Sequence, residues 1–385
     1  MRLLHTADWH LGIRFRQRDL LADQAHVLSQ LIKIAIDSKV QAVLIAGDVY
    51  DRGVPPAEAV ELLDHTIEQL ADQAGIPVFL IAGNHDDDVR VAFSSRLLAK
   101  SGYHVTGLLS ADPGHVVMHD AHGPVHILSI PYVDPPKARE CLADPNLTTH
   151  DAAFAAYLGR AKARIPPGER SVLIAHEFVA GGLACDSERP LTVGGTGAID
   201  VARLDGFHYV ALGHLHRPQA SWGERIRYAG SLLQYSFSEI GQTKSVNIVD
   251  LDAQGNVQVE SIPLVPRRPV RAIRGTLDEL LRDVPGDASR EDYLFVQLLD
   301  RGPVLEAMAR LQERYPNALA LEFPNRDVAS TAGTAASIAD QRRLSDAELF
   351  GGFFRYVTGE DLSEPEAQAF AELATDVRQK RDTGQ

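Results

Sequence analysis

The chain has 385 residues, of which 45% are hydrophobic and 23% are charged. This composition excludes a mostly disordered chain, a fibrous repeat and a membrane protein, and the length predicts roughly two to three domains. Two cysteines, Cys141 and Cys185, exclude a disulfide framework and a four-cysteine zinc site. The net charge of −14 argues against a protein that coats nucleic acid by bulk charge, but it allows a local basic groove.

The N-terminal residues do not have the charged and apolar segments of a signal peptide. The most apolar stretches, 42–46 and 77–82, are too short to cross a bilayer and resemble buried strands. We therefore expect a cytoplasmic protein.

The first hundred residues alternate strand and helix signals. Continuous apolar runs that end at a glycine, as at 42–46 and 78–82, are typical of strands covered on both faces. Another strand begins at Leu3, and apolar residues at helical spacing predict helices over 17–36 and 55–74. Strands separated by helices of this length predict a parallel sheet with right-handed crossovers.

From residue 104 to residue 262 the pattern becomes rich in strands, with one helix predicted over 151–163. Parallel βα units followed by a run of strands predict an α/β fold with two stacked β-sheets flanked by helices. The candidate strands cover 125–130, 172–175, 208–212, 245–251 and 257–262.

The sequence Val-Pro-Arg-Arg-Pro at 265–269 predicts a domain boundary. We expect a first domain over 1–265, a small α/β domain over 266–325 and a helical segment over 341–385. Residues 326–340, rich in small side chains, predict a flexible linker. The strands and helices predicted for the small domain alternate over 270–275, 277–282, 293–298, 304–314 and 318–323.

Five short polar motifs follow predicted strands, at the edge where open α/β sheets place their ligand crevice. Any one of them could be structural, but the ordered set indicates a function. Their carboxylates, imidazoles and neutral amide, without a thiolate, suit manganese, iron or zinc better than calcium or copper. The motifs are Asp8-Trp9-His10, Gly47-Asp48, Gly83-Asn84-His85-Asp86, Ala175-His176-Glu177 and Gly213-His214-Leu215-His216.

This donor set predicts a two-metal site, in which one carboxylate bridges ions about 3.5–4 Å apart. Asp48 is the best bridge because it belongs to the central motif. Glycines beside the ligands would let the backbone turn tightly, and they would also end the strands. We assign to one ion Asp8, His10 and His216, to the other Asn84, His176 and His214, and to the turns Gly47, Gly83 and Gly213.

His85 remains beside Asn84 without being needed as a ligand. A histidine near neutral pKa beside a phosphate suits general acid catalysis or transition-state stabilisation. Either Asp51 or Asp86 could orient it through its other ring nitrogen. Arg52 could contact a phosphate, or it could form a surface ion pair with Asp51.

The five motifs resemble the calcineurin-like metallophosphoesterase superfamily. Within it, the segments around them resemble the family of the bacterial exonuclease subunit SbcD over the whole chain. Archaeal and eukaryotic members carry a histidine where this chain has Asp51, which leaves the role of Asp51 open. The segments that carry the resemblance are 4–12, 47–52, 81–86, 176–182 and 211–218.

The resemblance implies a DNA nuclease that uses two Mn²⁺ ions, for which Mg²⁺ or Fe²⁺ could substitute. The implied activities are a 3′→5′ double-strand exonuclease and a single-strand or hairpin endonuclease, acting in DNA repair and recombination at the nucleoid. The small domain would cap DNA, and the helical segment would dock on the coiled coil of an SbcC-type partner, which uses the ATP. A homodimer within a heterotetramer is implied as well.

Two alternatives remain open: a phosphoesterase of the same superfamily acting on another substrate, and a non-catalytic scaffold for the ATPase. The 120 residues after the catalytic motifs exceed what a small substrate requires. Every predicted ligand is present, which argues against a scaffold.

Three surfaces of the chain suggest binding. Arg267, Arg268 and Arg271 lie in a locally basic stretch that could face DNA or form a solvated hinge. The helices near 57–74 and 91–100 could form the homodimer, because Leu62, Leu63 and Ile67 exceed what one core face requires, or they could simply pack on the sheet.

The third surface is an apolar stripe in the helical segment, which we expect to bind the partner. The alternative is that the stripe folds back on the small domain. A second amphipathic helix carries Phe370 and Leu373. The stripe consists of Leu349, Phe350, Phe353, Phe354 and Val357.

Overall fold

The computed structural model describes residues 1–188, 197–220, 222–282, 288–300, 304–324, 345–358 and 360–382. It divides into two compact units, residues 1–269 and 270–385. The unit boundary therefore falls at the end of the Val-Pro-Arg-Arg-Pro segment, a few residues after the predicted position. The predicted linker, 326–340, lies outside the described residues.

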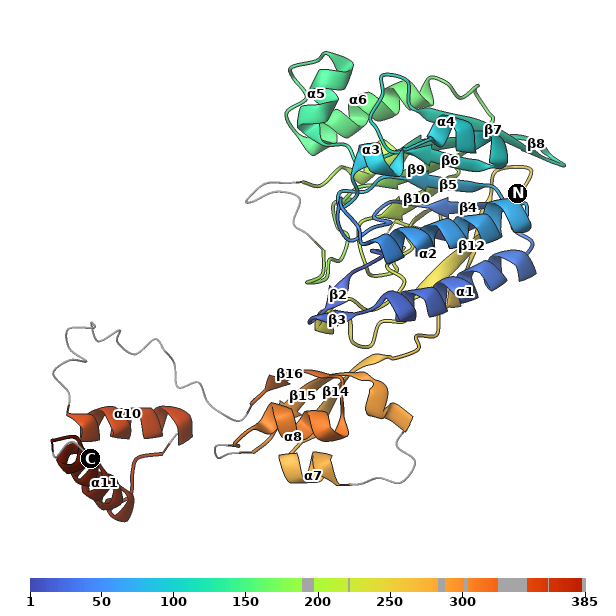
Figure 1. Ribbon diagram of the computed structural model, residues 1–385. Helices are drawn as coiled ribbons and strands as arrows, with labels where there is room; N and C mark the ends of the chain where they lie inside the picture. The colour runs from blue at the N-terminus through green and yellow to red at the C-terminus, as the bar shows by residue number, and fades with distance from the viewer. Residues whose placement is uncertain are drawn as a thin grey trace. The chain divides into compact units, whose positions relative to one another are not determined.

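The first unit contains a six-stranded mixed sheet in the order β13-β12-β1-β4-β5-β6 (Figure 1). The four strands of the N-terminal region run parallel, and the two later ones add antiparallel at one edge. The strands are β1 (Arg2–Thr6), β4 (Ala42–Ile45), β5 (Val78–Ile81), β6 (Tyr103–Thr106), β12 (Ser245–Leu251) and β13 (Val257–Pro263).

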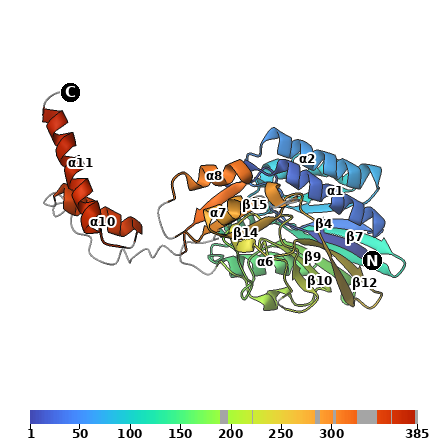
Figure 2. The same cartoon turned by 90° about the horizontal axis from the view of Figure 1, so that it is seen from below.

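Helices α1 (Leu21–Asp37) and α2 (Ala57–Ile67) connect the parallel strands and lie side by side against this sheet (Figure 2). Apolar residues at helical spacing, among them Val27 and Leu31 of α1 and Leu63 of α2, are buried. This one-sided burial explains why both segments are helical, since an amphipathic helix is stabilised mainly by the face it packs.

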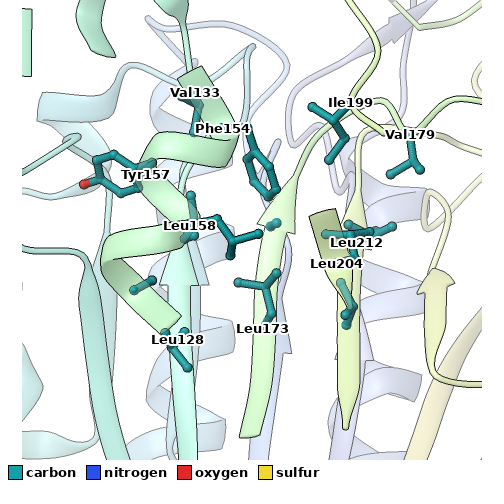
Figure 3. Close-up of a cluster of buried hydrophobic side chains, with 14 of the residues drawn as sticks. Leu128, Val133, Phe154, Tyr157, Leu158, Leu173, Val179, Ile199, Leu204 and Leu212 are labelled. Carbon is teal, nitrogen blue, oxygen red and sulfur yellow. The ribbon is translucent and has the colours of Figure 1, made fainter. Parts of the chain in front are cut away.

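The second sheet of this unit has five strands in the order β11-β10-β9-β8-β7. Helix α6 (His150–Lys162) packs on its outer face, where Phe154 and Leu158 contact a cluster with Leu173 and Leu212 (Figure 3). Helix α5 (Pro135–Leu142) precedes it. The strands are β7 (Gly114–Asp120), β8 (Gly123–Ile130), β9 (Arg170–His176), β10 (Tyr209–Gly213) and β11 (Ile226–Tyr228).

The two sheets share a dry core in which Leu44 and Phe79 from one sheet pack with Ile127 and Val172 from the other. Both sheets thus bury one face against each other and the other face against helices. The predicted architecture of stacked sheets flanked by helices is confirmed.

Two local predictions are corrected. The helix expected over 17–36 begins only at Leu21, because the preceding residues form a tight ribbon of β2 (Arg14–Phe15) and β3 (Arg18–Asp19). Arg16 and Gln17 at its tip have φ of 47° and 72°, a left-handed backbone that ends helical periodicity. Helix α5 went unpredicted, although Pro135-Pro136 begins it.

In the second unit, three parallel strands, β14 (Val270–Gly275), β15 (Tyr293–Leu298) and β16 (Ala318–Glu322), form a sheet in that order. Helices α7 (Leu277–Leu281) and α8 (Ala307–Arg314) share its core. Two further helices, α10 (Asp346–Thr358) and α11 (Glu364–Asp382), follow. Among the described residues, no helix combines the length and apolar character that a membrane span requires.

Candidate metal centre

All seven predicted metal ligands come together at the C-terminal ends of strands from both sheets of the first unit. Asp8 and His10 follow β1, Asp48 follows β4 and Asn84 follows β5. From the other sheet, His176 ends β9, and His214 and His216 follow β10. Asn84 is half-buried and the other six are buried.

The first predicted donor group is assembled around two facing imidazoles. The Nε2 atoms of His10 and His216 lie 3.0 Å apart. The carboxylate of Asp8 completes a set whose ligand atoms all lie within 4.8 Å of one another. The backbone N–H of His214 donates to Asp8 Oδ1 at 2.9 Å and orients this carboxylate.

The second predicted donor group is centred on the Asn84 amide. Its Oδ1 atom lies 3.0 Å from His176 Nε2 and 3.0 Å from His214 Nδ1. His176 is oriented from behind, because its Nδ1 bonds the carbonyl oxygen of Ala46 at 2.8 Å. Such a bond fixes the tautomer that leaves Nε2 with a lone pair for a metal.

The Asp48 carboxylate lies between the two groups. Its Oδ2 is 3.7 Å from His10 Nε2 and 3.3 Å from His176 Nε2. Its Oδ1 accepts the backbone N–H of His85 at 2.8 Å, which fixes the rotation of the carboxylate. Asp48 therefore occupies the position that a bridging ligand requires.

These residues fit divalent metal ions. Two buried imidazole nitrogens that face each other at 3.0 Å have at most one proton to share when both rings are neutral, whereas a cation near both would accept both lone pairs. Imidazole with carboxylate and amide oxygens is a donor mixture for manganese, iron or zinc.

Burial and charge set opposite proton affinities within the centre. Burial raises the pKa of Asp8 to about 7. For Asp48 burial acts in the same direction, but the attraction of His176 and His10 outweighs it and holds the pKa well below its usual range. Burial disfavours protonated His176, yet Asp48 and Asp8 raise its pKa to about 10.

Four of the ligands sit in strained backbone. Asp8, His10, Asp48 and His214 have φ of 52°, 45°, 49° and 100°, values uncommon for residues other than glycine. Such strain persists where the surrounding structure enforces it, typically at functional sites.

The three predicted glycines serve two purposes. Gly47 has a φ of +87°, as a tight turn requires. Gly83 and Gly213 instead allow close approach: a Cβ atom would lie 2.2 Å from Asp48 Oδ1 at Gly83 and 1.9 Å from the Ala46 carbonyl oxygen at Gly213.

His85 lies at the edge of the centre, with Nε2 4.0 Å from Asp48 Oδ2. Its Nδ1 bonds the backbone carbonyl oxygen of Asp51 at 2.8 Å, so a main-chain atom orients it instead of either predicted carboxylate. Asp86 has another task, because its carboxylate accepts the N–H groups of Val49, Tyr50 and Gly83 and thereby ties two ligand loops together. Burial raises the pKa of Asp86 to about 7.

The predicted arginines differ in their partners. Arg52 is half-exposed, with Nε 3.7 Å from Asp51 Oδ2, which is the ion-pair alternative. Arg268 pairs with Asp23 at 2.9 Å and Arg271 with Asp292 at 2.6 Å, whereas Arg267 is exposed. Two of the three arginines expected to face DNA thus have carboxylate partners in their own chain.

Sequence reasoning missed several residues around the centre. Buried Gln24 and Tyr235 bond the loop that carries His10. Ser187 bonds His216 Nδ1 at 2.8 Å and also donates to Glu239, which pairs with buried Lys244. Their only sequence signal is a polar residue within an apolar pattern, which does not reveal its partner.

A basic element was also missed. The ribbon of β2 and β3 directly follows the first ligand loop and exposes Arg14 and Arg16, with Arg18 also exposed. Phe15 anchors it, because its ring packs 4.9 Å from that of Phe237. The helix expected from residue 17 onward includes Arg18 and therefore obscured this arrangement.

The two predicted protein-binding surfaces are partly covered. Leu63 and Ile67 pack inward, contrary to the expectation that they exceed the core. In the helical segment, Phe350 stacks on Phe370 with ring centroids 4.0 Å apart, while Phe353 stays exposed. The side chain of Val357 lies outside the described residues; the other stripe positions are Leu349, exposed, and Phe354, half-buried.

Comparison with known proteins agrees with this geometry. A family model described as calcineurin-like phosphoesterase matches residues 1–218, and one described as the type 5 capsule protein repressor C-terminal domain matches residues 266–358. The chain is 32% identical over 375 residues to the D subunit of the nuclease SbcCD from Staphylococcus saprophyticus, covering 97% of this chain and 98% of that protein. The protein of the same name from Staphylococcus epidermidis is 29% identical over 373 residues, with the same coverage.

Solved structures include a dimetal phosphatase from Danio rerio, 14% identical, which covers 69% of this chain and 99% of its own with a TM-score of 0.41. Fold, donor set and family match together define a metal-dependent phosphoesterase. The two stacked sheets carry its centre on their joint edge. Within the calcineurin-like phosphoesterases, this chain belongs to the SbcD family.

Proposed function

We propose that the chain is the DNA nuclease subunit of a complex with an SbcC-type coiled-coil ATPase, and that it uses two Mn²⁺ ions. The observation that carries this proposal is Asp48 Oδ2, which faces His10 on one side and His176 on the other. An oxygen shared between two ion sites is what in-line cleavage of a phosphodiester requires. The names of the two staphylococcal relatives support DNA as the substrate and the ATPase as the partner.

When bound, two divalent ions supply Lewis-acid activation of the scissile phosphate and of the attacking water. The chain's own residues hold the ions and move the proton. His85 Nδ1 donates to the carbonyl oxygen of Asp51, so Nε2 is the atom that faces the site. Protonated there, His85 can give its proton to the departing sugar oxygen as a general acid.

The basic ribbon supports DNA binding. Arg14, Arg16 and Arg18 project from a short, strained element that begins a few residues after His10. Exposed guanidinium groups beside a phosphoesterase centre suit a phosphate backbone, despite the net charge of −14. We include exposed Arg267 and the half-exposed Arg52 in the same surface function.

The family also supports 3′→5′ exonuclease activity on duplex ends and endonuclease activity on hairpins and single strands, serving repair and recombination of chromosomal DNA in the cytoplasm. Docking of the ATPase is supported by exposed Leu349, Phe353 and Leu373 on α10 and α11. Any use of ATP belongs to that partner.

A homodimer is supported by a surface beside α2. Around the short helices α3 (Asp88–Val91) and α4 (Ser95–Leu98), Val89, Phe93 and Leu97 are 61%, 79% and 69% exposed. Exposed apolar clusters of this kind mark association sites. A sedimentation mass near the monomer value of 42.0 kDa at micromolar concentration would contradict the dimer.

The central test incubates the purified chain, with Mn²⁺ or Mg²⁺, with end-labelled duplex, hairpin and single-stranded DNA, in the presence and absence of the ATPase. We expect Mn²⁺-dependent cutting of hairpins and single strands by the chain alone and ATP-stimulated degradation of duplex only with the partner. Hydrolysis of a small phosphodiester without any cutting of DNA would show a phosphoesterase for another substrate. No hydrolysis at all would support a scaffold.

A further inference from the structure

The loop that carries Asp8 and His10 is held on two sides. On one side its backbone pairs with the next ligand loop, since His10 N donates to the Asp48 carbonyl oxygen at 2.9 Å and Leu11 N to that of Val49 at 2.9 Å. Because Asp8 and His10 are left-handed, the carbonyl groups of Trp9 and His10 turn away from that pairing. Buried carbonyls need other donors.

Gln24 supplies those donors from helix α1. Its Nε2 donates to the carbonyl oxygens of Trp9 and His10, both at 2.9 Å, and its Oε1 accepts the N–H of Gly12 at 3.1 Å. The side chain is fully buried. One amide group thus binds three positions of the loop, and no carboxylate or aliphatic side chain could make the same set of bonds.

Tyr235 completes the arrangement from a distant part of the chain. Its hydroxyl donates to the Trp9 carbonyl oxygen at 2.5 Å and lies 3.1 Å from Gln24 Nε2. Its ring packs edge-on against the imidazoles of His10 and His216, with centroid distances of 5.7 and 5.9 Å. Tyr235 therefore touches both imidazoles of the first donor group.

His10 needs this support because its ring has no orienting hydrogen bond. Its Nδ1 is buried and has no partner among the described residues. The other ligands differ, since His176 Nδ1 bonds the Ala46 carbonyl oxygen and His216 Nδ1 bonds Ser187. Metal-binding histidines almost always carry such a bond on the second nitrogen.

We propose that Gln24 and Tyr235 are positioning residues that hold His10 in its metal-binding orientation through its main chain and ring face, in place of the missing hydrogen bond at Nδ1. They thereby set the affinity of the ion site formed by Asp8, His10 and His216. This inference rests on the proposed two-metal function, because it assigns the clamp to one of the two ions.

The test is calorimetric titration of metal-free full-length protein with Mn²⁺ alone. Gln24→Met preserves the volume but removes the amide, and we expect one of two Mn²⁺ ions to bind about 10- to 100-fold more weakly, the scale for groups that orient metal ligands. Gln24→Glu keeps an acceptor for Gly12 but cannot donate to the two carbonyls, so we expect a loss at least as large. Tyr235→Phe keeps the ring contact and loses one donor, so a smaller loss is expected.

Thr66→Val is the matched control. Thr66 is also buried in the first unit and donates to a backbone carbonyl, that of Leu62 at 2.7 Å, away from the centre. We expect it to lower the melting temperature in EDTA without changing Mn²⁺ affinity. If Gln24→Met does not fold, Tyr235→Phe carries the same test.

Folded variants at Gln24 that bind both Mn²⁺ ions with wild-type affinity would overturn the clamp. A wild-type protein that binds only one Mn²⁺ ion would overturn the two-metal function instead. In that case a weaker single ion in Gln24→Met would still support the clamp, so the two failures are distinguishable.

Discussion

The imidazole Nδ1 of His85 lies 2.8 Å from the backbone carbonyl oxygen of Asp51. A main-chain acceptor has no proton to give and cannot be removed by replacing the Asp51 side chain. The orientation of the candidate general acid therefore depends on the fold of the 48–52 loop, and the Asp51 carboxylate is available for another task, such as its contact with Arg52 at 3.7 Å.

We predict that His85→Ala keeps its metal ions and its DNA affinity but cleaves at least about a hundredfold more slowly, the scale for loss of a general acid. Asp51→Ala should be affected much less, since the orienting carbonyl remains. Single-turnover cleavage of a labelled hairpin compares the two. Equal losses would assign a direct role to the Asp51 carboxylate.

Asp48→Ala should lose more metal than any other single ligand replacement. Its Oδ2 faces both donor groups, whereas Asn84 contacts only the second. Elemental analysis after gel filtration measures the retained ions, with Asn84→Ala as the comparison. Two tightly retained ions in Asp48→Ala would exclude the bridging role.

Asp120→Asn should destabilise the first unit in a pH-dependent manner. Arg170 donates to both Asp120 carboxylate oxygens, at 2.6 and 2.9 Å, with both side chains about 6% exposed. Breaking one partner of a buried pair costs about 3–5 kcal/mol. The bonds from Arg170 lower the pKa of Asp120 below 3.8, so its contribution is complete above that pH and is lost as the pH falls through the folded-state value.

Denaturant unfolding of wild type and Asp120→Asn at several pH values checks this sign. The difference in unfolding free energy should be constant near neutral pH and should shrink below about pH 3.8. A difference that grows on acidification would contradict the assignment. Arg203→Ala, whose ion pair with Asp151 is partly exposed, should cost only about 0–1 kcal/mol.

Charge reversal in the basic ribbon should weaken DNA binding. Arg14→Glu with Arg16→Glu should lower affinity and flatten its salt dependence, because fewer phosphate contacts release fewer counterions. Arg268→Glu is the contrasting variant: it replaces the partner of Asp23 and should mainly destabilise the fold. Binding titrations of duplex DNA at several salt concentrations measure the slope. An unchanged slope in the ribbon variant would remove it from the DNA surface.

The exposed part of the helical segment should bind the ATPase. Leu349→Glu with Phe353→Glu should abolish co-purification with the partner and ATP-stimulated duplex degradation, while Mn²⁺-dependent cutting of single strands continues. Phe350→Ala instead removes the ring stacked on Phe370 and should loosen α10 against α11. Full stoichiometry of the complex after the double replacement would show that docking lies elsewhere.

The sequence by itself determined the fold class and the members of the metal centre. Apolar runs that end at Gly47 and Gly83 indicated buried strands, and the polar residue after each run marked the shared edge. These signals are local, because a strand's burial and its end are both written in adjacent residues. For the same reason all seven ligands could be named from the chain alone.

Only the tertiary structure decided how the ligands are held. Gln24 and Tyr235 meet the same Trp9 carbonyl, although Tyr235 is 226 residues away from it, and His10 faces His216 across 206 residues. The arginines at 268 and 271 likewise suggested a DNA surface until Asp23 and Asp292 are seen beside them. Pairings of this kind depend on the folding of distant segments against one another, and no periodicity or spacing along the chain encodes which polar group will meet which.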